Sequence, residues 1–382
     1  MSSLLKSTEI FLYSIESNDT YDLIIVGAGP VGCVVAERAA TLYNWRSLII
    51  DKRSHIAGNC YDSTRKSGLM VHNYGPHYFR TNSSEIIDYL SEFTSWIEGD
   101  YIVKSKIGDE LFPFPINLET LEQFFGLSNL NSESAQELLD SKREEILEPI
   151  NSEEFVLSRV GKELYEAFYL GYTQKMWDKH PSELDPSVCG RIPIKLNRDP
   201  FYVEHKYKKL PEKGYTEMFR RMTDHPLIDF KLGTDYFDIK DDLKASKATI
   251  YTGPIDRYFD FIYGKLEWRS LDFQFEELNQ EFAQECVQVN YPGDEAFTRK
   301  VEIKHITKQK HNKTVVCTEF PKSQGEPYYP VPNKENQERY RKYKELSTFE
   351  KDTFFVGRLA EYTYINTDEA IAKGLKAVSK LA

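Results

Sequence analysis

One segment of this chain, DLIIVGAGPVG at residues 22–32, restricts the possible folds more than any other. An apolar run leads into Gly27, Gly29 and Gly32, and a helical pattern follows them. The first glycine allows a tight turn, the second lets a phosphate approach the backbone, and the third lets helix and strand pack closely. Asp51 ends the next apolar run, where an acid can bind a ribose hydroxyl. This spacing predicts a Rossmann-like dinucleotide site. It does not distinguish between NAD and FAD as the ligand. The alternative is a glycine turn that binds no ligand.

Hydrophobic periodicity indicates the helices of the remaining chain. One helix is expected after the cap candidates Ser83 and Ser84. Its apolar face would consist of Ile86, Leu90, Phe93 and Ile97. A helical region is expected from residue 118 to about 175, with a buried stripe formed by Val156, Val160, Leu164 and Phe168. A closing helix is expected over residues 368–381.

Extended segments are predicted from alternation and turn residues. Gly108 and Asp109 separate two short extended segments within residues 101–115, which predicts a hairpin. Segments rich in Val, Ile and Thr predict an antiparallel sheet, and they cover 285–291, 297–306 and 313–320. Residues 249–253 and 353–356 are expected to be short buried strands that return to the nucleotide-binding core. Four prolines within residues 181–200 predict a long loop.

These elements predict an α/β fold of several domains, as a length of 382 residues allows. The predicted parts are an N-terminal extension (1–20), a discontinuous Rossmann-like dinucleotide-binding domain (21–90, 215–262 and 336–382), a helical insertion domain (116–180) and an antiparallel sheet domain (91–115, 181–214 and 263–335) with a mobile loop near 186–200. Residues 1–20 have only short apolar stretches, so neither a signal peptide nor a membrane span is expected. No other run approaches the length of a membrane span, which predicts a soluble protein.

Charge and cysteine usage exclude some classes of function. A formal net charge of -11 argues against nucleic acid as the main partner, because phosphate backbones require a basic surface. Local arginines would have to hold a phosphorylated substrate against this charge. The cysteines form no CxxC or Cys/His cluster, so we expect reduced thiols, a cytoplasmic location and no metal site. They are Cys33, Cys60, Cys189, Cys286 and Cys317.

Eight further segments resemble the UDP-galactopyranose mutase family. They are DKRSHIAGNCYD (51–62), YGPHYFRTN (74–82), GYTQKMW (171–177), GRIPIK (190–195), YTGPIDRYFD (251–260), LEWRSLDF (266–273), EPYYPV (326–331) and GRLAEYTY (357–364). Together they are far more specific than the glycine turn, and the resemblance runs from about Tyr21 to the C-terminus.

The resemblance implies FAD as the cofactor, active when reduced. It gives the pyrophosphate and ribose contacts to the three glycines and Asp51, and further flavin contacts to Lys52, Gly58, Asn59, Gly357, Arg358 and Asn366. Asn366 or Thr367 can cap the last helix, whose positive N-terminus would face the flavin edge that becomes negative on reduction. An ordinary helix cap is the alternative.

The family isomerises a nucleotide sugar between six- and five-membered rings without net redox change. The resemblance implies that flavin N5 attacks the anomeric carbon and displaces UDP, that the resulting iminium opens the ring, and that the 4-hydroxyl closes it to give UDP-galactofuranose for cell-surface polysaccharides. A cofactor that is itself the nucleophile agrees with the lack of a Ser-His-Asp set. Expected partners are a nucleotide sugar, a reductant such as NAD(P)H or a reductase, and a second copy in a homodimer or higher oligomer, with neither nucleic acid nor membrane insertion.

The resemblance also assigns substrate contacts. Arg191 and Arg269 would clamp the diphosphate, with Arg191 on a mobile loop that can close. His77 would lie beside the flavin, where it donates a hydrogen bond or tunes the reduced cofactor. The remaining contacts are Asn117, the phosphate-binding tyrosines Tyr202, Tyr329 and Tyr364, and a uridine pocket of Phe168, Tyr172, Thr173 and Trp177. By residue type alone, ion-paired surface arginines and core aromatic residues are the alternatives.

Three positions depart from the family pattern. Most members have histidine in place of Arg80, aspartate in place of Asn366 and an aromatic residue in place of Val203. Arg80 offers several donors, so it can bind an acetamide carbonyl. We therefore expect UDP-N-acetylgalactopyranose or another modified nucleotide sugar as substrate. The alternatives are an FAD-dependent oxidoreductase of amine-oxidase type on the same fold and a non-catalytic nucleotide-sugar or flavin-binding protein.

Overall fold

A five-stranded parallel sheet forms one end of the molecule in the computed structural model, which describes residues 20–99 and 101–381. Its strand order is β10-β2-β1-β11-β17. The strands are β1 (Tyr21–Val26), β2 (Ser47–Asp51), β10 (Ile228–Leu232), β11 (Ala245–Tyr251) and β17 (Thr353–Phe355). The returning strands that the sequence predicts near 249–253 and 353–356 are therefore confirmed.

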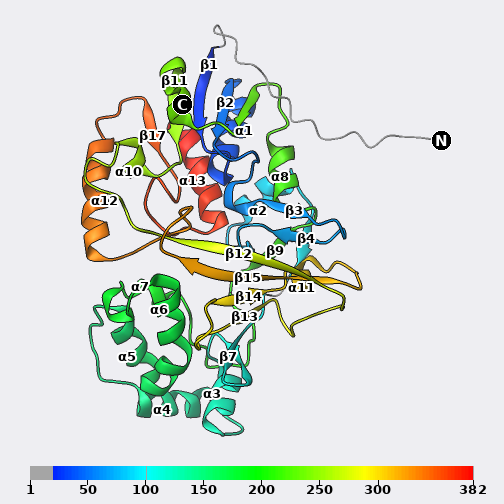
Figure 1. The fold of residues 1–382 in the computed structure, drawn as a ribbon, viewed down its shortest axis with the longest axis vertical. Coiled ribbons are helices and arrows are strands. Elements are labelled where there is room, and N and C mark those ends of the chain that lie inside the picture. Colours follow the sequence, from blue (N-terminus) through cyan, green and yellow to red (C-terminus); the bar gives the residue numbers. More distant parts are fainter. Residues whose placement is uncertain (1–19, 100, 382) are drawn as a thin grey trace, which may run out of the picture.

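Helices α1 (Pro30–Tyr43) and α13 (Thr367–Ser379) pack against this sheet and share one apolar core. Figure 1 shows α13, in red, beside the blue strands and α1. Their close approach depends on Gly374, where a Cβ would lie 2.9 Å from the Val34 side chain. The closing helix is confirmed, and it brings the C-terminal residues back to the first strand.

A seven-stranded sheet crosses the middle of the molecule (Figure 1), with the order β16-β12-β15-β14-β13-β7-β8. The strands are β7 (Val103–Ile107), β8 (Glu110–Phe114), β12 (Trp268–Leu278), β13 (Gln288–Asn290), β14 (Arg299–Val301), β15 (Thr314–Lys322) and β16 (Tyr329–Pro330). The hairpin at Gly108 and Asp109 is confirmed. The purely antiparallel prediction is wrong at one place, because β13 pairs with β7 in parallel.

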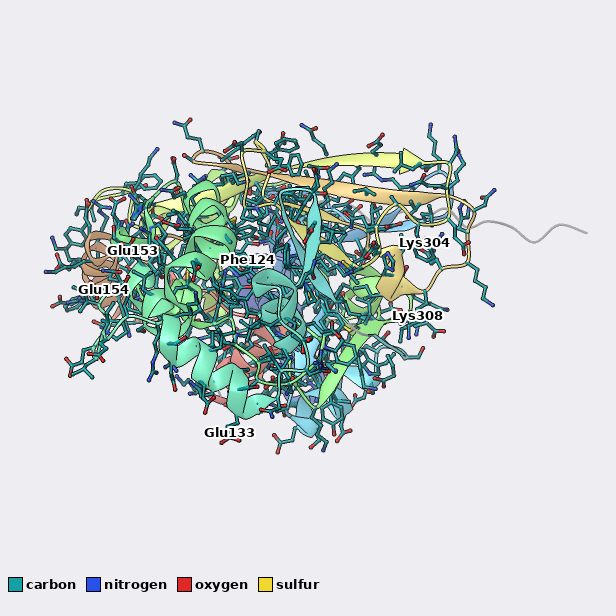
Figure 2. All side chains as sticks on the ribbon, turned by 90° about the horizontal axis from the view of Figure 1, so that it is seen from below. Phe124, Glu133, Glu153, Glu154, Lys304 and Lys308 are labelled. Carbon is teal, nitrogen blue, oxygen red and sulfur yellow. The ribbon has the colours of Figure 1, made fainter. Side chains whose placement is uncertain are left out.

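A helical region lies below this sheet in Figure 1. The predicted stretch is a series of short helices: α3 (Leu118–Phe125), α4 (Ser132–Lys142), α5 (Ser152–Leu164), the π-helical turn Tyr165–Leu170 and α6 (Gly171–Trp177). The predicted apolar stripe is buried, and Phe124 packs on Phe112 and Phe168. In Figure 2, Phe124 lies inside this region and Glu133, Glu153 and Glu154 lie at its edge, away from Lys304 and Lys308 on the other side of the molecule.

Some predicted boundaries are wrong. Helix α2 (Ser84–Ser91) begins at the Ser83 cap, but Ile97 lies on strand β6 (Trp96–Glu98), where it pairs with Leu210. The last three residues of the extended segment predicted over 297–306 belong instead to the helical turn α11 (Lys304–Thr307). At Ile97, pairing with a distant strand overrides the local helical spacing. The long loop predicted over residues 181–200 is confirmed, and it contains two short helical turns, a 3-10 turn (Pro181–Glu183) and α7 (Ser187–Gly190).

The smaller elements connect these layers. They are β3 (Asp62–Thr64), β4 (Met70–His72), β5 (Phe79–Thr81), β9 (Tyr207–Pro211), α8 (Gly214–Met222), α9 (Tyr236–Ile239), α10 (Ile255–Tyr258) and α12 (Lys334–Ser347). The domain limits stay a prediction, and the extension 1–20 falls almost wholly outside the described residues. Over residues 20–99 and 101–381, no helix is long and apolar enough to cross a bilayer, and no cluster of three His, Cys, Asp or Glu side chains could hold a metal ion. The five cysteines are buried and form no disulfide.

Candidate active site

The turn between β1 and α1 uses its three glycines in different ways. Gly27 has a φ of +112°, and a Cβ there would lie 2.0 Å from Thr252 Oγ1. A Cβ on Gly32 would lie 2.0 Å from the Gly27 carbonyl oxygen. In contrast, a Cβ on Gly29 would meet only Gly58 Cα, at 3.9 Å. Gly27 and Gly32 are thus required for packing, whereas Gly29 leaves space for a ligand.

A cavity of about 270 Å³ opens at the carboxyl ends of β1, β2 and β11. Asp51 is held there because its Oδ2 accepts a hydrogen bond from the Ala28 N–H (2.8 Å) and its Oδ1 accepts one from the Arg53 N–H (2.8 Å). The structure places most of the predicted cofactor contacts in the wall of this cofactor cavity: Gly27, Gly29, Asp51, Lys52, Gly58, Asn59, Gly357, Arg358 and Asn366. A dinucleotide fits this combination of a glycine cradle, a helix N-terminus and an oriented acid.

A second cavity, of about 410 Å³, lies between the seven-stranded sheet, α6 and the segment after α7. The structure brings together in its wall the predicted residues His77, Arg80, Phe168, Tyr172, Thr173, Trp177, Arg191, Tyr202, Val203, Tyr329 and Tyr364. This substrate cavity meets the cofactor cavity at shared wall residues, which are Asn59, His77, Arg358, Asn366 and Thr367. A reactive group at the end of a bound cofactor can therefore reach a second ligand.

Positive charge collects around Tyr364. The guanidinium carbons of Arg191 and Arg358 lie 4.9 Å and 5.0 Å from its ring centre. Burial raises the pKa of Tyr364, but Arg191, Arg358, Arg80 and Arg299 together bring it below its usual value. Four cations act on one hydroxyl in a chain of net charge -11, so this part of the cavity suits a diphosphate.

His77 is a neutral acceptor where the cavities meet. Burial, reinforced by His72 and Arg358, lowers the pKa of His77 to about 3. Its Nδ1 lies 3.0 Å from the Gly75 carbonyl oxygen and must carry the proton of that hydrogen bond. Nε2 is then left as an acceptor. The alternative in which His77 donates a hydrogen bond to the flavin does not fit this arrangement.

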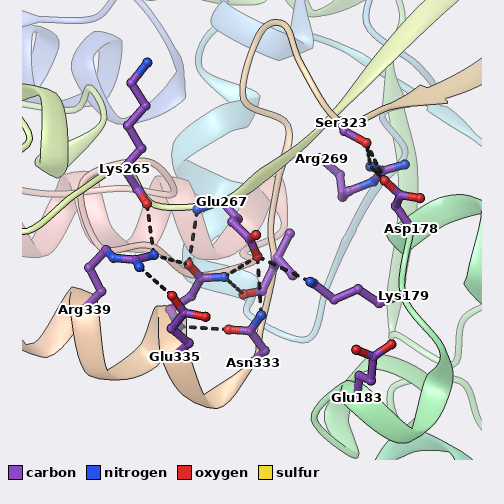
Figure 3. A network of polar contacts seen from close by, with 12 residues as sticks. Asp178, Lys179, Glu183, Lys265, Glu267, Arg269, Ser323, Asn333, Glu335 and Arg339 are labelled. Carbon is purple, nitrogen blue, oxygen red and sulfur yellow. Dashed lines mark hydrogen bonds and ion pairs between the residues drawn. The ribbon is translucent and has the colours of Figure 1, made fainter.

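The structure does not bring Arg269 into either cavity. Arg269 Nε donates to the Met176 carbonyl oxygen (2.7 Å), and another nitrogen donates to Ser323 Oγ (2.6 Å), while Asp178 lies beside it. Figure 3 shows Arg269 facing Ser323 and Asp178. Its guanidinium is buried and satisfies the carbonyl end of α6, so its placement does not fit a diphosphate clamp.

Arg299, which sequence reasoning missed, lines the substrate cavity. Its Nε donates to Glu319 Oε2 (2.7 Å), and another nitrogen lies 3.3 Å from the Tyr329 hydroxyl. Arg299 and Glu319 are directly opposite on β14 and β15, and the Glu319 side chain is almost fully buried. Arg299 is half-buried and Glu319 is buried, and the sequence alone does not determine the strand register that pairs them.

Three further side chains lie at helix N-caps or beside the junction of the two cavities. Asn117 is buried as the N-cap of α3, with its Oδ1 accepting from the Thr120 N–H (3.0 Å), and it does not line the substrate cavity. Arg53, not assigned from the sequence, donates to Asn59 Oδ1 (2.9 Å) and so orients a side chain at the junction of the two cavities. At the same junction, Asn366 is the N-cap of α13.

Comparison with known proteins gives consistent matches along the chain. The family model for UDP-galactopyranose mutase matches residues 167–364, and a model for an NAD(P)-binding Rossmann-like domain matches residues 25–93. A probable UDP-galactopyranose mutase of Klebsiella pneumoniae is 35% identical, with 94% of each chain covered. A dTDP-fucopyranose mutase of Escherichia coli is 32% identical, covering 93% of this chain and 96% of that protein.

Solved structures share the fold at low sequence identity. A reduced UDP-galactopyranose mutase superposes with a TM-score of 0.75 at 15% identity, covering 95% of this chain and 94% of the other. A putative protoporphyrinogen oxidase from Exiguobacterium gives a TM-score of 0.66 at 12% identity, covering 95% of this chain and 99% of the other. The fold alone therefore does not separate an isomerase from an oxidase.

Proposed function

Because this chain belongs to the UDP-galactopyranose mutase family, we propose that it is a flavin-dependent isomerase that interconverts the pyranose and furanose forms of a nucleotide sugar. The observation that carries the proposal is the junction of two cavities, one with a dinucleotide-binding turn and one with an arginine-rich wall. No net oxidation is required, which distinguishes this reaction from that of an oxidase.

FAD is the proposed cofactor, and the open space above Gly29 supports it. Gly27, Gly29 and the N-terminus of α1 would hold the pyrophosphate, and Asp51 would hold a ribose. When bound and reduced, the flavin would supply the nucleophile that takes the sugar from its diphosphate and returns it. The N-terminus of α13, at the junction of the cavities, would favour negative charge there.

The protein's own part in the reaction is binding, orientation and charge stabilisation. Arg191 and Arg299 would hold the departing diphosphate, with hydroxyls from Tyr329 and Tyr364 beside them. Arg299 would take the role that the family resemblance assigned to Arg269. The aromatic side chains of α6 and the preceding turn would hold the nucleobase by stacking.

Arg80 supports a modified sugar as the substrate. Arg80 lines the substrate cavity, and one of its terminal nitrogens donates to Asn366 Oδ1 (3.1 Å). Its other side-chain donors have no hydrogen-bond partner within residues 20–99 and 101–381. We propose UDP-N-acetylgalactopyranose or another modified nucleotide hexose. Relatives named for UDP-galactopyranose and for dTDP-fucopyranose support testing both nucleotides.

The test begins with the purified protein and its absorption spectrum. Reduced and oxidised enzyme are each incubated with UDP-galactopyranose, UDP-N-acetylgalactopyranose and dTDP-fucopyranose, and the products are separated by chromatography. Furanose products that form only with reduced enzyme support the proposal. A colourless protein that FAD does not reconstitute, equal rates with oxidised enzyme, or stoichiometric oxygen consumption would contradict it, and the last result would favour the oxidoreductase.

The same assay tests substrate choice with the Arg80→His variant. If Arg80 recognises an acetamide carbonyl, the variant should shift preference toward UDP-galactopyranose by about tenfold, the effect of one good hydrogen bond. An unchanged ratio of kcat/KM for the two sugars contradicts this role.

A reductant such as NAD(P)H, a homo-oligomeric state and a cytoplasmic location stay predictions.

A further inference from the structure

A chain of three hydrogen-bonded side chains lies in the wall of the substrate cavity. The Tyr101 hydroxyl donates to Gln288 Oε1 (2.7 Å), and Gln288 Nε2 donates to Asn290 Oδ1 (2.7 Å). All three residues are at most 6% exposed. Gln288 and Asn290 are two positions apart on β13 and therefore share one face of the sheet. None of the roles described above uses them.

The chain ends next to the cationic part of the cavity. Asn290 is directly opposite Arg299 on β14, and Arg299 is directly opposite Glu319 on β15. Asn290, Arg299 and Glu319 thus form a row across three strands. Cross-strand neighbours of this kind have Cβ atoms about 5 Å apart, so the Asn290 amide and the Arg299 guanidinium can contact one ligand group.

The direction of the chain is set at its Tyr101 end. A tyrosine hydroxyl can donate or accept, and here it donates to Gln288 Oε1. Gln288 then accepts with its oxygen and donates with its nitrogen. Asn290 Oδ1 accepts the hydrogen bond from Gln288 Nε2. Asn290 Nδ2 has no hydrogen-bond acceptor within residues 20–99 and 101–381.

We propose that Gln288 is a positioning residue, which with Tyr101 holds the Asn290 amide so that Nδ2 donates a hydrogen bond to a phosphate oxygen of the nucleotide sugar. Asn290 Nδ2, the Arg299 guanidinium and the Tyr329 hydroxyl would offer donors to the same acceptor group. A phosphate has only acceptors in its dianionic form, so a fixed donor is preferable to an amide that can turn. This inference depends on the proposed nucleotide-sugar site.

The Gln288→Glu variant reverses the direction of the chain at almost constant shape. The introduced carboxylate only accepts, so it would take a hydrogen bond from Asn290 Nδ2 and leave Oδ1 facing the phosphate. We expect the Kd of the holoenzyme for UDP or dTDP, whichever the wild type binds more tightly, to rise at least tenfold. The variants Tyr101→Phe and Gln288→Met each remove hydrogen bonds of the chain without adding a charge, so each should raise this Kd by about threefold. The Kd for uridine or thymidine, which lack phosphate, should change less than twofold.

The control variant Gln280→Glu adds the same charge at an exposed loop position and should leave both affinities unchanged. A general loss of structure would weaken the binding of uridine or thymidine as well. In turnover, KM should rise while kcat stays within about threefold.

The outcomes separate this inference from the proposed function. If the wild-type holoenzyme binds neither UDP nor dTDP, the positioning role of Gln288 and the proposed function are both wrong. If it binds one of them and Gln288→Glu binds it within twofold of wild type, only the positioning role is wrong. Equal weakening of nucleotide and nucleoside binding also overturns it.

Discussion

Arg269 and Arg299 lie on strands of the same sheet, but Arg269 is buried and Arg299 is half-buried, and they face different surroundings. Arg269 donates to the carbonyl end of α6 and to Ser323, whereas Arg299 lines the substrate cavity and pairs with Glu319. A buried guanidinium that already satisfies the main chain has few donors left for a ligand. Substitution of Arg299 should therefore reduce activity, whereas substitution of Arg269 should reduce stability.

We expect Arg299→Lys to lower kcat/KM by 10- to 100-fold while the thermal midpoint changes little. Lysine keeps the charge but loses the planar fork that binds two phosphate oxygens. Arg269→Met should instead lower the midpoint by several degrees, because the Met176 carbonyl loses its donor, at about 1–3 kcal/mol. Steady-state kinetics and calorimetry on both variants check this. A 100-fold loss of kcat in Arg269→Met with an unchanged midpoint would return Arg269 to the clamp.

Two histidines with lowered pKa values, the buried His72 and the half-buried His77, make stability depend on pH. Burial lowers the pKa of His72 to about 4 and that of His77 to about 3, against about 6.5 in an unfolded chain. Between these values the unfolded state binds more protons, so stability present above pH 6.5 is lost as the pH falls. Each histidine contributes up to about 1.4 kcal/mol per pH unit.

The His72→Asn variant tests this dependence, because asparagine keeps an acceptor for the His77 N–H. Between pH 7 and pH 4.5 the thermal midpoint of the wild type should fall more steeply than that of the variant. Measuring both proteins in the same buffers cancels the contribution of carboxyl groups such as Glu319, whose pKa burial raises. Parallel midpoint curves would show that His72 takes no part in the acid sensitivity.

At the scale of elements, the turn between β1 and α1 combines two requirements in three residues, 27–29. Glycine is required at position 27 because φ is positive there and Thr252 leaves no space for a Cβ. In contrast, Gly29 faces open space in the cofactor cavity. A residue needed for the fold and one needed for the ligand thus stand two positions apart. Substitution can separate these requirements.

Gly29→Ala should fold normally and bind FAD at least tenfold more weakly, since its methyl group enters the space for the pyrophosphate. Gly27→Ala should lower the yield of folded protein, because alanine is strained at positive φ and its methyl group would collide with Thr252 Oγ1. Circular dichroism measures folding, and titration of the apoprotein with FAD measures affinity. Tight FAD binding by Gly29→Ala would contradict the assigned position of the pyrophosphate.

Element types were predictable where a local pattern was strong. The glycine turn, the Gly108–Asp109 hairpin and the closing helix depend on residues close together in the chain. Ile97 shows the limit, because its helical spacing is real but pairing of β6 with β9 places it in a strand. The parallel pairing of β13 with β7 likewise joins segments almost 200 residues apart, which no local pattern records.

At the scale of the whole molecule, the cofactor cavity joins distant parts of the chain. Its wall includes residues of the first turn, Thr234 and Thr252 from the middle of the chain, and Arg358 and Asn366 near the C-terminus. A ligand bound there would contact segments that lie far apart in the chain. Cofactor binding should therefore stabilise the entire fold.

We expect the apoprotein to unfold several degrees below the holoenzyme. Adding FAD at about 100 times its Kd should restore about 2.7 kcal/mol of stability. Differential scanning calorimetry over a series of FAD concentrations checks the logarithmic dependence of this gain. A midpoint that does not respond to FAD would indicate that the cavity is not the cofactor site.

The sequence by itself determined the dinucleotide-binding turn, the family and most residues that line the two cavities. These follow from short motifs, whose backbone conformation or chemistry allows few alternatives. Only the tertiary structure decided that Arg299 and not Arg269 faces the substrate cavity, that Asn117 is a helix cap, and that Tyr101, Gln288 and Asn290 form one hydrogen-bonded chain. The reason is strand register, because a shift of one residue turns a side chain to the opposite face of a sheet.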